Sequence, residues 1–273
     1  MEKQVGIIGC GNMGQAIAER IKADYQVVVF DKDTTKTENL KGIEALNSIA
    51  DLVKKVDAII LAVKPQDFEV VLEEIKGLTK DRLIISIAAG ISSGYIEKKL
   101  VSARAIRVMP NLAARIGRGM ICLCKGRSAT EEDLNFSKRL FNNLGKTMVL
   151  PEDMMDAATA ISGSGPGFLF AWAQDKSIEE IKKYAIYTFG PALAKCARNA
   201  GFNPEQADIL AEATAAGSVA FLEATKINPG EAKKQVASKA GTTEAGLKVL
   251  QAGGTLEEAV NAALNRAKEL SRS

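Results

Sequence analysis

The stretch that decides the fold is Val5–Gly14, which reads VGIIGCGNMG. Its start, Val5–Ile8, has the composition of a buried β-strand, and a G-x-G-x-x-G pattern follows at once and opens a helical segment. In this pattern Gly9 permits a tight turn, Gly11 lets the backbone approach a pyrophosphate, and Gly14 lets helix and strand pack closely. The helix start attracts the anion. The stretch therefore predicts the phosphate-binding loop of a dinucleotide-binding domain, with Asn12 and Met13 at the helix start.

An acidic residue stands where such a domain needs one. Asp31 follows the second strand-like run, Val27–Phe30, and lies 22 residues after Gly9. A carboxylate there accepts hydrogen bonds from the adenosine ribose and repels a 2′-phosphate. Lys32 and Lys36 are close enough to offset that repulsion, although lysines are often only solvated. The predicted cofactor is NAD or NADP, with a slight preference for NAD because of Asp31.

Strand-like and helical segments alternate through the first 150 residues. The strand-like runs are Val5–Ile8, Val27–Phe30, Ala58–Val63, Leu83–Ile87, Ala105–Met109, Gly119–Lys125 and Lys146–Leu150. The helical segments between them include Met13–Ile21, Ser48–Lys55, Asp67–Ile75 and Thr130–Leu144. Nearly continuous apolar runs are typical of parallel strands that helices cover on both faces. The pattern predicts an α/β protein with an N-terminal Rossmann-type domain over residues 1–151.

The composition changes after Pro151. Nothing downstream resembles a strand, and alanine, glycine and leucine become frequent. One predicted helix carries residues at spacings of 3, 4, 3 and 4, which are Leu210, Ala213, Gly217, Ala220 and Ala224. Such a narrow stripe lets another helix approach closely, either within the domain core or across a subunit interface. Residues 152–273 are therefore expected to form an all-helical domain, and the stripe leaves open whether it belongs to the core or to a subunit interface.

Composition excludes several classes of function. The chain of 273 residues has no histidine, so it lacks the usual general base, zinc ligand and partner of a nucleophilic serine or cysteine. It has 36 Lys and Arg residues and 33 Asp and Glu residues. The resulting net charge of +3 gives no reason to expect nucleic-acid binding. No apolar run approaches the length of a membrane span, and the start does not have the layout of a signal peptide. We expect a cytoplasmic protein without a metal site, whose four cysteines are buried free thiols.

Five further motifs carry a family resemblance. They read AVKPQ at Ala62–Gln66, SIAAG at Ser86–Gly90, RVMPN at Arg107–Asn111, ISGSGP at Ile161–Pro166 and SKAGTT at Ser238–Thr243. In this order and spacing they resemble the pyrroline-5-carboxylate reductases over nearly the whole chain. The resemblance implies a Rossmann domain, a helical dimerisation domain, and reduction of the cyclic imine 1-pyrroline-5-carboxylate to proline by hydride from NAD(P)H. It also implies a homodimer or a higher homo-oligomer.

The resemblance also assigns roles to single residues. Thr243 would hydrogen-bond the ring nitrogen of the substrate, and Ser238 with the amides of Gly241, Thr242 and Thr243 would hold its carboxylate. Residues expected against the cofactor, besides the glycine loop and Asp31, are Ala62, Val63, Lys64, Pro65, Ala88 and Asn111. The residues themselves support the carboxylate site, because GTTE at Gly241–Glu244 reads as a helix start, where free amides and the helix dipole bind anions. The threonines could also simply cap the helix, a role compatible with anion binding because the helix start still has to be ordered. An iminium carbon is already electrophilic, so positioning supplies much of the catalysis and no histidine is needed.

The chain departs from the family pattern in three places. Leu112-Ala113 follow Met-Pro-Asn where the family has Thr-Pro, and Lys239-Ala240 stand where it has Pro-Gly. Losing a proline and a glycine is expected to loosen or reshape the loop before Thr243. The stretch Gln174–Tyr187 reads as an inserted, exposed amphipathic helix.

Three other functions remain open from the sequence. The substrate could be another cyclic imino acid, because the loop before Thr243 is altered. Lys195 and Asn199, one helical turn apart, resemble the catalytic pair of hydroxyacid dehydrogenases, although the glycine that precedes that lysine is missing. A cofactor-binding protein without catalysis, with a regulatory role, is the third possibility.

Overall fold

A computed structural model describes residues 3–271, and their contacts divide them into two compact units. The first unit holds residues 3–108 and Leu123–Glu152, and the second holds Met109–Cys122 and residues 153–271. The chain therefore passes between the units at residues 108/109, 122/123 and 152/153.

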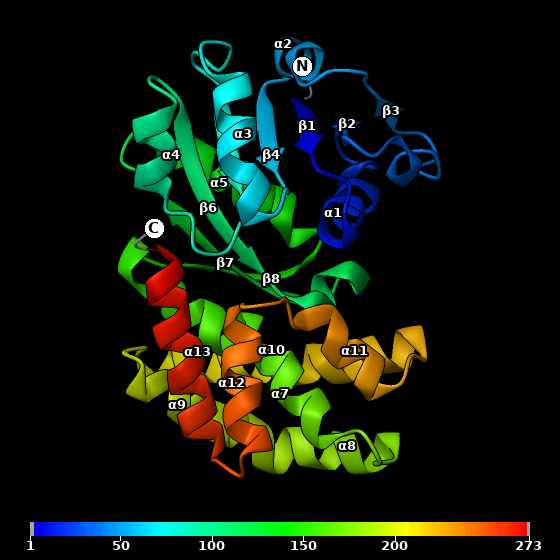
Figure 1. Ribbon diagram of the computed structural model, residues 1–273, viewed down its shortest axis with the longest axis vertical. Coiled ribbons are helices and arrows are strands. Elements are labelled where there is room, and N and C mark those ends of the chain that lie inside the picture. Colours follow the sequence, from blue (N-terminus) through cyan, green and yellow to red (C-terminus); the bar gives the residue numbers. More distant parts are fainter. Residues whose placement is uncertain (1–2, 272–273) are drawn as a thin grey trace. The chain divides into compact units, whose positions relative to one another are not determined.

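The first unit is built on one sheet with the strand order β3-β2-β1-β4-β5-β6-β7-β8 (Figure 1). The strands are β1 (Gln4–Ile8), β2 (Gln26–Phe30), β3 (Glu44–Ala45), β4 (Ala58–Leu61), β5 (Leu83–Ser86), β6 (Arg104–Pro110), β7 (Gly119–Lys125) and β8 (Gly145–Val149). The pairs from β3 to β6 are parallel, and Ile8 stands beside both Phe30 and Leu61. The carboxyl ends of β1, β2 and β4 therefore meet at one edge, where doubly wound sheets bind ligands.

Helices cover the sheet, with α3 and α4 in front of it and α5 behind it in Figure 1. The helical segments of this unit are α1 (Asn12–Ile21), η1 (Thr34–Lys36), α2 (Ile49–Lys55), α3 (Pro65–Ile75), α4 (Ser93–Lys99) and α5 (Glu131–Asn142). Their starts follow local chemistry: Ser48 caps α2, and Thr130 forms a reciprocal capping box with Asp133 at α5. The apolar faces of α2, α3 and α4 share one buried cluster with β4 and β5.

The predicted strands and helices of this half are confirmed, each within three residues. Strand β3 and helix α4 have no counterpart among the predicted segments. Glu44–Ala45 is a two-residue strand with exposed side chains, so it has no hydrophobic signal. Helix α4 has seven residues and buries only Ser93 and Ile96, which is too few to show a helical period.

The described part of the chain after residue 152 is entirely helical, as predicted (Figure 1). Its segments are α6 (Met155–Ala158), the π-helical turn η4 (Thr159–Gly163), α7 (Gly165–Trp172), α8 (Ile178–Tyr184), the π-helical turn η5 (Ala185–Phe189), α9 (Gly190–Asn199), α10 (Pro204–Thr225), α11 (Pro229–Val236), α12 (Thr242–Gln251) and α13 (Leu256–Ser271). The short 3-10 segments η2 (Leu112–Ile116) and η3 (Glu152–Met154) complete the set.

Helix α10 carries the predicted stripe of small residues, and the stripe proves mixed. Leu210 and Gly217 are buried, whereas Ala224 is exposed and the two alanines between are half-buried. A Cβ at Gly217 would lie 3.0 Å from that of Ala113, so glycine there lets η2 lie against α10. This part of the stripe therefore serves the core of the second unit.

The segment predicted to be an inserted helix, Gln174–Tyr187, is helical only from Ile178, and the helix continues through η5 into α9. A capping box between Ser177 and Glu180 starts α8. The ring of Tyr184 stacks on that of Trp172 at 3.7 Å between centroids, which ties α8 back to α7. Ile186 and Tyr187 in η5 are exposed.

Candidate functional site

The glycine loop after β1 leaves room for a ligand at one position only. Gly9 has φ +102°, and a Cβ there would lie 2.7 Å from the carbonyl oxygen of Ala62. A Cβ at Gly14 would collide with the carbonyl oxygen of Gly9, so this glycine is needed for packing. A Cβ at Gly11 would meet nothing within 4 Å. The loop is therefore tight against the sheet at Gly9 and Gly14 and open toward solvent at Gly11.

The first turn of α1 adds an electropositive helix start to this opening. Gly11 is the N-cap and has no side chain with which to cap the helix. The first intrahelical bond runs from the Gln15 N–H to the Gly11 carbonyl at 2.9 Å. The amides of Asn12, Met13 and Gly14 precede that bond, so they have no acceptor within the helix. Such a turn binds phosphate groups through its free N–H groups and its dipole.

Asp31 closes the loop from the end of β2. Its side chain is only 8% exposed, and its Oδ2 accepts the amide proton of Cys10 at 2.6 Å. Its Oδ1 accepts from the Asp33 amide at 2.9 Å and from Lys36 Nζ at 3.3 Å. Asp31 therefore supports the glycine loop as well as bordering the ligand space.

A cavity of about 510 Å³ lies at this edge of the sheet. Its walls include the predicted cofactor residues Gly9, Gly11, Asp31, Ala62, Val63 and Lys64, together with Lys32 and Lys36. The Ala62 N–H donates to the Ile8 carbonyl at 2.8 Å, and Lys64 is the N-cap of α3, with Pro65 as its first residue. Ala88 is buried just beyond β5, where its N–H donates to Ser86 Oγ at 3.2 Å.

The buried thiol beside this loop is not a reactive group. Burial, with a smaller contribution from the Asp31 carboxylate, raises the pKa of Cys10 to about 12. The thiol stays protonated at neutral pH and is a poor nucleophile. The four cysteines are buried free thiols, as predicted.

The predicted substrate residues lie in the second unit, around the start of α12. Thr242 and Thr243 are both buried, and both of their hydroxyls lie 3.1 Å from the hydroxyl of Ser164. The N-cap of α12 is Gly241, without a side-chain cap. The alternative in which the threonines only cap the helix is therefore wrong: their side chains point to Ser164.

The loop before α12 has an alanine, Ala240, where the family pattern has a glycine. Ala240 adopts the left-handed conformation with φ +57°. Its N–H donates to Glu244 Oε2 at 2.7 Å, and its carbonyl accepts from Arg266 Nε at 2.9 Å. The Gly241 N–H donates to the Ser238 carbonyl at 3.0 Å, while the side chains of Ser238 and Lys239 are exposed. Side chains of Glu244 and Arg266 therefore hold the loop at Ala240.

Asn111 lies in the part of the second unit that comes from residues 109–122. It is buried, and its Oδ1 accepts the amide proton of Met120 at 3.1 Å. Its Nδ2 donates to Ser162 Oγ at 3.4 Å, which connects the end of β6 to η4. Asn111 therefore has a structural role within this unit.

Two groups of residues that the structure singles out carry no predicted role. Ser162 and Ser164 belong to the motif Ile161–Pro166. The two hydroxyl groups in that motif are the sequence signal that could have marked them as site residues. Arg107, buried in β6, pairs with Glu152 Oε1 at 2.6 Å, and Ser93 donates its amide N–H to Glu152 Oε2 at 3.1 Å. Isolated charged residues so far apart in sequence gave no signal for this pair.

The hydroxyacid dehydrogenase alternative finds no support at its two residues. The Lys195 side chain is 68% exposed, with Nζ 3.7 Å from a carboxylate oxygen of Glu257. Asn199 donates to the same carboxylate at 3.0 Å. Both residues make ordinary surface contacts with α13.

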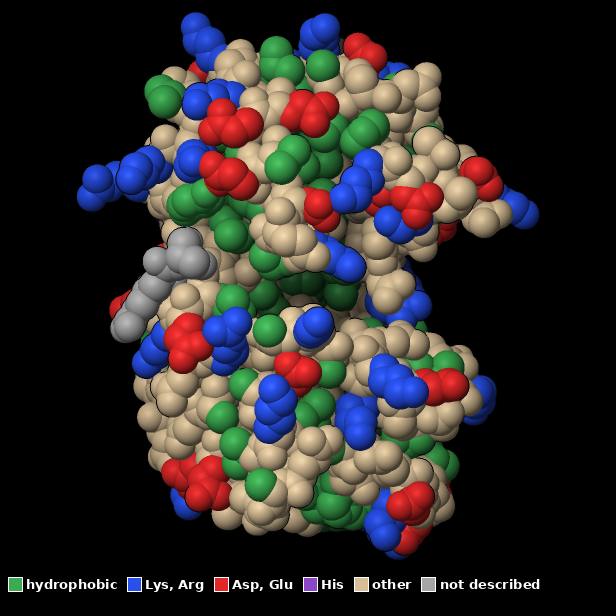
Figure 2. Space-filling model, in the orientation of Figure 1, with side chains coloured by type: hydrophobic (Ala, Val, Ile, Leu, Met, Phe, Trp, Pro, Cys, Tyr) green, Lys and Arg blue, Asp and Glu red, His purple; other side chains and the backbone are tan. Residues whose placement is uncertain are grey.

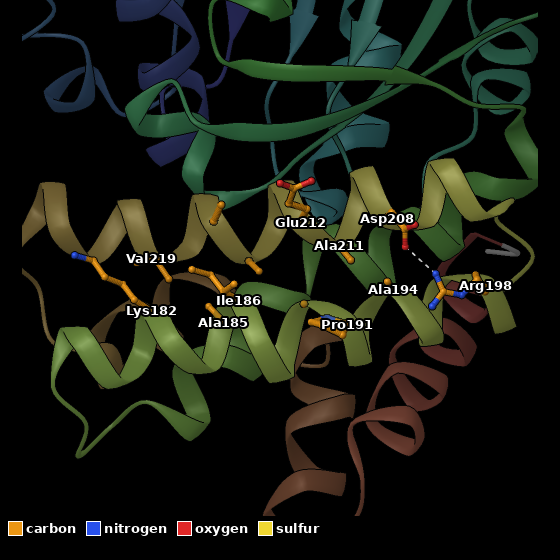
Figure 3. A pocket seen from close by; sticks show the side chains of 13 residues that line it. Lys182, Ala185, Ile186, Pro191, Ala194, Arg198, Asp208, Ala211, Glu212 and Val219 are labelled. Atoms are coloured by element: carbon orange, nitrogen blue, oxygen red, sulfur yellow. Dashed lines mark hydrogen bonds and ion pairs between the residues drawn. The ribbon is translucent and has the colours of Figure 1, made fainter.

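The second unit also carries an apolar groove of about 790 Å³ between η5–α9 and α10 (Figure 3). Ala185, Ile186, Pro191 and Ala194 line one side, and Ala211, Ala215 and Val219 line the other. Ion pairs border it: Arg198 contacts Asp208 at 2.7 Å (Figure 3), and Lys182 contacts Glu223 at 2.8 Å.

Surface charge is mixed, and Figure 2 shows blue and red side chains interspersed over the face that it presents. Within residues 3–271, no helix combines the length and the apolar character that a membrane crossing requires.

Comparison with known proteins gives consistent results. Residues 4–90 match the family model described as NADP oxidoreductase, coenzyme F420-dependent, and residues 184–270 match the one described as pyrroline-5-carboxylate reductase dimerisation. The chain is 34% identical to the pyrroline-5-carboxylate reductase of Methanosarcina acetivorans, with all of both chains covered. It superimposes on that of Coxiella burnetii with a TM-score of 0.67 and 28% identity, again covering all of both chains. The Plasmodium falciparum pyrroline carboxylate reductase with NADP bound gives a TM-score of 0.63 at 26% identity over 98% of both chains.

Proposed function

Since the chain belongs to the pyrroline-5-carboxylate reductase family and reduces 1-pyrroline-5-carboxylate to proline with NAD(P)H, we propose which of its residues carry out this reaction. The sequence predicts a dinucleotide-binding domain over residues 1–151 and a helical substrate domain over residues 152–273. The contacts amend this division, because Met109–Cys122 groups with the helical unit and Glu152 with the first unit. The observation that carries the proposal is the pair of preformed sites, one in each unit: an open glycine loop and a hydroxyl cluster at a helix start.

The residues of the first unit fit a nicotinamide dinucleotide. The open space at Gly11 would take the pyrophosphate, and the amides of Asn12, Met13 and Gly14 would donate to it. Asp31 would accept from the adenosine ribose, and Ala62–Pro65, Ala88 and Asn111 would border the nicotinamide half. The bound cofactor supplies the hydride, and the protein supplies binding and orientation.

The start of α12 would hold the substrate. Helix α12 has ten residues, and the amides of Thr242 and Thr243 can donate to a carboxylate while the helix dipole favours its charge. The Gly241 amide, which donates to the Ser238 carbonyl in the structure, would have to exchange that bond to join them. Ser238 would add a hydroxyl donor. With the carboxylate fixed there, the Thr243 hydroxyl would meet the ring nitrogen and orient the C=N carbon for hydride addition.

The cofactor preference leans to NAD. The buried Asp31 carboxylate at the cavity wall opposes the 2′-phosphate of NADP, but Lys36 Nζ, 3.3 Å away, neutralises part of that charge. The preference for NAD therefore depends on the ion pair between Asp31 and Lys36.

The assembly is at least a homodimer, formed through the helical domain. The apolar groove between η5–α9 and α10 supports a contact with a second copy, because it leaves Ile186 exposed between ion pairs. A nicotinamide enzyme with four buried free thiols also fits the reducing cytoplasm.

Oxidation of NADH and NADPH tests the proposal, with pyrroline-5-carboxylate and pyrroline-2-carboxylate compared as substrates. We expect turnover with the 5-carboxylate at least tenfold above that with the 2-carboxylate, because the carboxylate at α12 fixes which ring carbon faces the cofactor. Turnover of the 2-carboxylate alone would assign the site to another cyclic imino acid. Cofactor binding without oxidation of either dinucleotide would instead indicate a protein without catalysis.

A further inference from the structure

Ser164 lies between the two threonine hydroxyls at the start of α12. Thr243 Oγ1 donates to Ser164 Oγ at 3.1 Å, and Ser164 Oγ lies 3.1 Å from Thr242 Oγ1, where either oxygen can donate. Ser164 has no exposed surface. The proposed function uses Thr243 and gives Ser164 no task.

A π-helical turn and a glycine bring this serine to the start of α12. The π-helical turn η4 precedes it, and the Ser164 N–H donates to the Thr159 carbonyl at 2.9 Å, five residues back. Such turns are rare and often occur at functional sites. At Gly167, one turn further, a Cβ would lie 2.6 Å from Thr243 Cγ2. Glycine there lets α7 and the start of α12 approach until the hydroxyls touch.

The chemistry of the substrate decides which hydroxyl donates in the hydrogen bond between Thr243 and Ser164. A hydroxyl has one proton and two lone pairs. The protonated ring nitrogen of the imine is only a donor, so the hydroxyl that meets it must present a lone pair. The Thr243 proton must then point elsewhere, and Ser164 Oγ is the acceptor in place. Ser164 in turn can donate its own proton to Thr242.

We infer that Ser164 is a positioning residue: it takes the Thr243 proton, so that Thr243 faces the ring nitrogen as an acceptor. This inference rests on the role proposed for Thr243. In the reaction the hydride bonds to the ring carbon and the C=N π pair becomes the nitrogen lone pair. The N–H bond persists, so no proton passes through the serine.

The first test is Ser164→Ala. Without the serine the Thr243 hydroxyl can turn its proton toward the nitrogen, so kcat should fall roughly tenfold, the equivalent of one misdirected hydrogen bond. The KM for NAD(P)H should stay unchanged. The isotope effect on kcat with cofactor deuterated at the transferred position should rise, because hydride transfer becomes slower than product release. Ser218→Ala is the control, since it removes another buried serine hydroxyl, one that donates to the Thr214 carbonyl at 2.7 Å, and should leave kcat unchanged.

The second test is a double-mutant cycle with Thr243→Val. If Ser164 acts through Thr243, adding Ser164→Ala to Thr243→Val causes no further loss of kcat. Additive losses, or full kcat in Ser164→Ala while Thr243→Val is slow, would overturn the inference and leave the role of Thr243 intact. Full kcat in Thr243→Val would instead refute the role proposed for Thr243, and with it this inference.

Thr242→Val decides the matter if Ser164→Ala does not fold. This substitution keeps the backbone amide and the shape of the side chain but removes the acceptor for the Ser164 proton. That proton should then turn to Thr243 and push the Thr243 proton toward the substrate, lowering kcat several-fold with the KM for NAD(P)H unchanged. Wild-type kcat in Thr242→Val would contradict the ordered chain of hydroxyls.

Discussion

The Asp31 carboxylate accepts the amide proton of Cys10 over 2.6 Å, so the end of β2 holds the middle of the glycine loop in place. The same carboxylate contacts Lys36 Nζ at 3.3 Å. Asp31 thus links the shape of the phosphate loop to the charge at the ribose end of the cavity, and the two effects can be separated by mutation.

Asp31→Ala should weaken the binding of both NADH and NADPH by roughly tenfold, because the Cys10 amide loses its acceptor and the loop shifts. Fluorescence titration of each cofactor measures this. Asp33→Ala, which removes an exposed carboxylate, is the matched control. Tighter NADPH binding with unchanged NADH binding in Asp31→Ala would contradict this. It would show that Asp31 only opposes the 2′-phosphate and does not support the loop.

Gly11→Val should abolish cofactor binding and leave the protein folded, because its Cβ enters open space where the pyrophosphate is expected. Gly14→Ala should instead destabilise the first unit, because its Cβ collides with the Gly9 carbonyl. Cofactor titration and thermal unfolding of both variants separate the two roles. Normal cofactor titration of Gly11→Val would show that the pyrophosphate does not bind at this loop.

Gly167→Ala should lower kcat several-fold although it removes no functional group. The added methyl would lie 2.6 Å from Thr243 Cγ2 and force the start of α12 to move, and small displacements of catalytic groups cost rate. Gly94→Ala in α4 is the control, because a Cβ there meets nothing within 4 Å and should be neutral or stabilising. Equal kcat in the two variants would show that α12 tolerates the shift.

Ala240→Gly should stabilise the second unit by up to about 1 kcal/mol. It relieves a left-handed alanine at φ +57°, which outweighs the entropy that glycine loses on folding. Ala237→Gly, at an ordinary φ of −80°, should destabilise it instead. A rise of the Tm in the first variant and a fall in the second would confirm the strain; a fall in both would contradict it.

Glu152→Gln should lower the Tm at neutral pH and matter less in acid. Burial raises the pKa of the Glu152 carboxyl, but hydrogen bonds from Ser93 and the Arg107 guanidinium outweigh it and hold the pKa below its ordinary range. A lowered pKa stabilises the fold above the pKa of the unfolded chain, and the contribution disappears as the pH falls through the folded value.

Glu152 is 35% exposed, so solvent screening limits the effect at pH 7 to roughly 1–2 kcal/mol. The difference in Tm between wild type and Glu152→Gln, followed from pH 7 to pH 3, should shrink below about pH 4. Glu179→Gln, an exposed partner of Lys182, should show almost no difference at any pH. A constant difference for Glu152 across this range would contradict the ionic origin.

The parts predicted from the sequence are those with a periodic or positional signal. Strand β4 is apolar throughout, β1 and β5 are apolar apart from one end residue each, and the glycine loop has a fixed spacing, so all of them can be predicted from the sequence. Contacts between distant segments have no such signal. The Ser164–Thr243 contact joins residues 79 positions apart, and only the packing of α7 on α12 reveals it.

One loop combines local and distant contacts. The loss of a proline and a glycine before Thr243 predicts a looser or reshaped loop. In the structure Ala240 has φ +57°, and hydrogen bonds to Glu244 and Arg266 hold both sides of the residue. Glu244 lies four residues downstream, but Arg266 comes from α13, so half of the compensation is tertiary.

The grouping of Met109–Cys122 with the helical unit bears on how such proteins can recombine. A helical half cut at residue 151 would leave behind η2 and Asn111, which its own α10 and η4 contact. Exchange of halves between two relatives would therefore succeed only if an internal piece of the first half travelled with the second. Two crossovers flanking that piece and a third near residue 152 are required, so the halves are expected to be inherited together and to diverge as one genetic module.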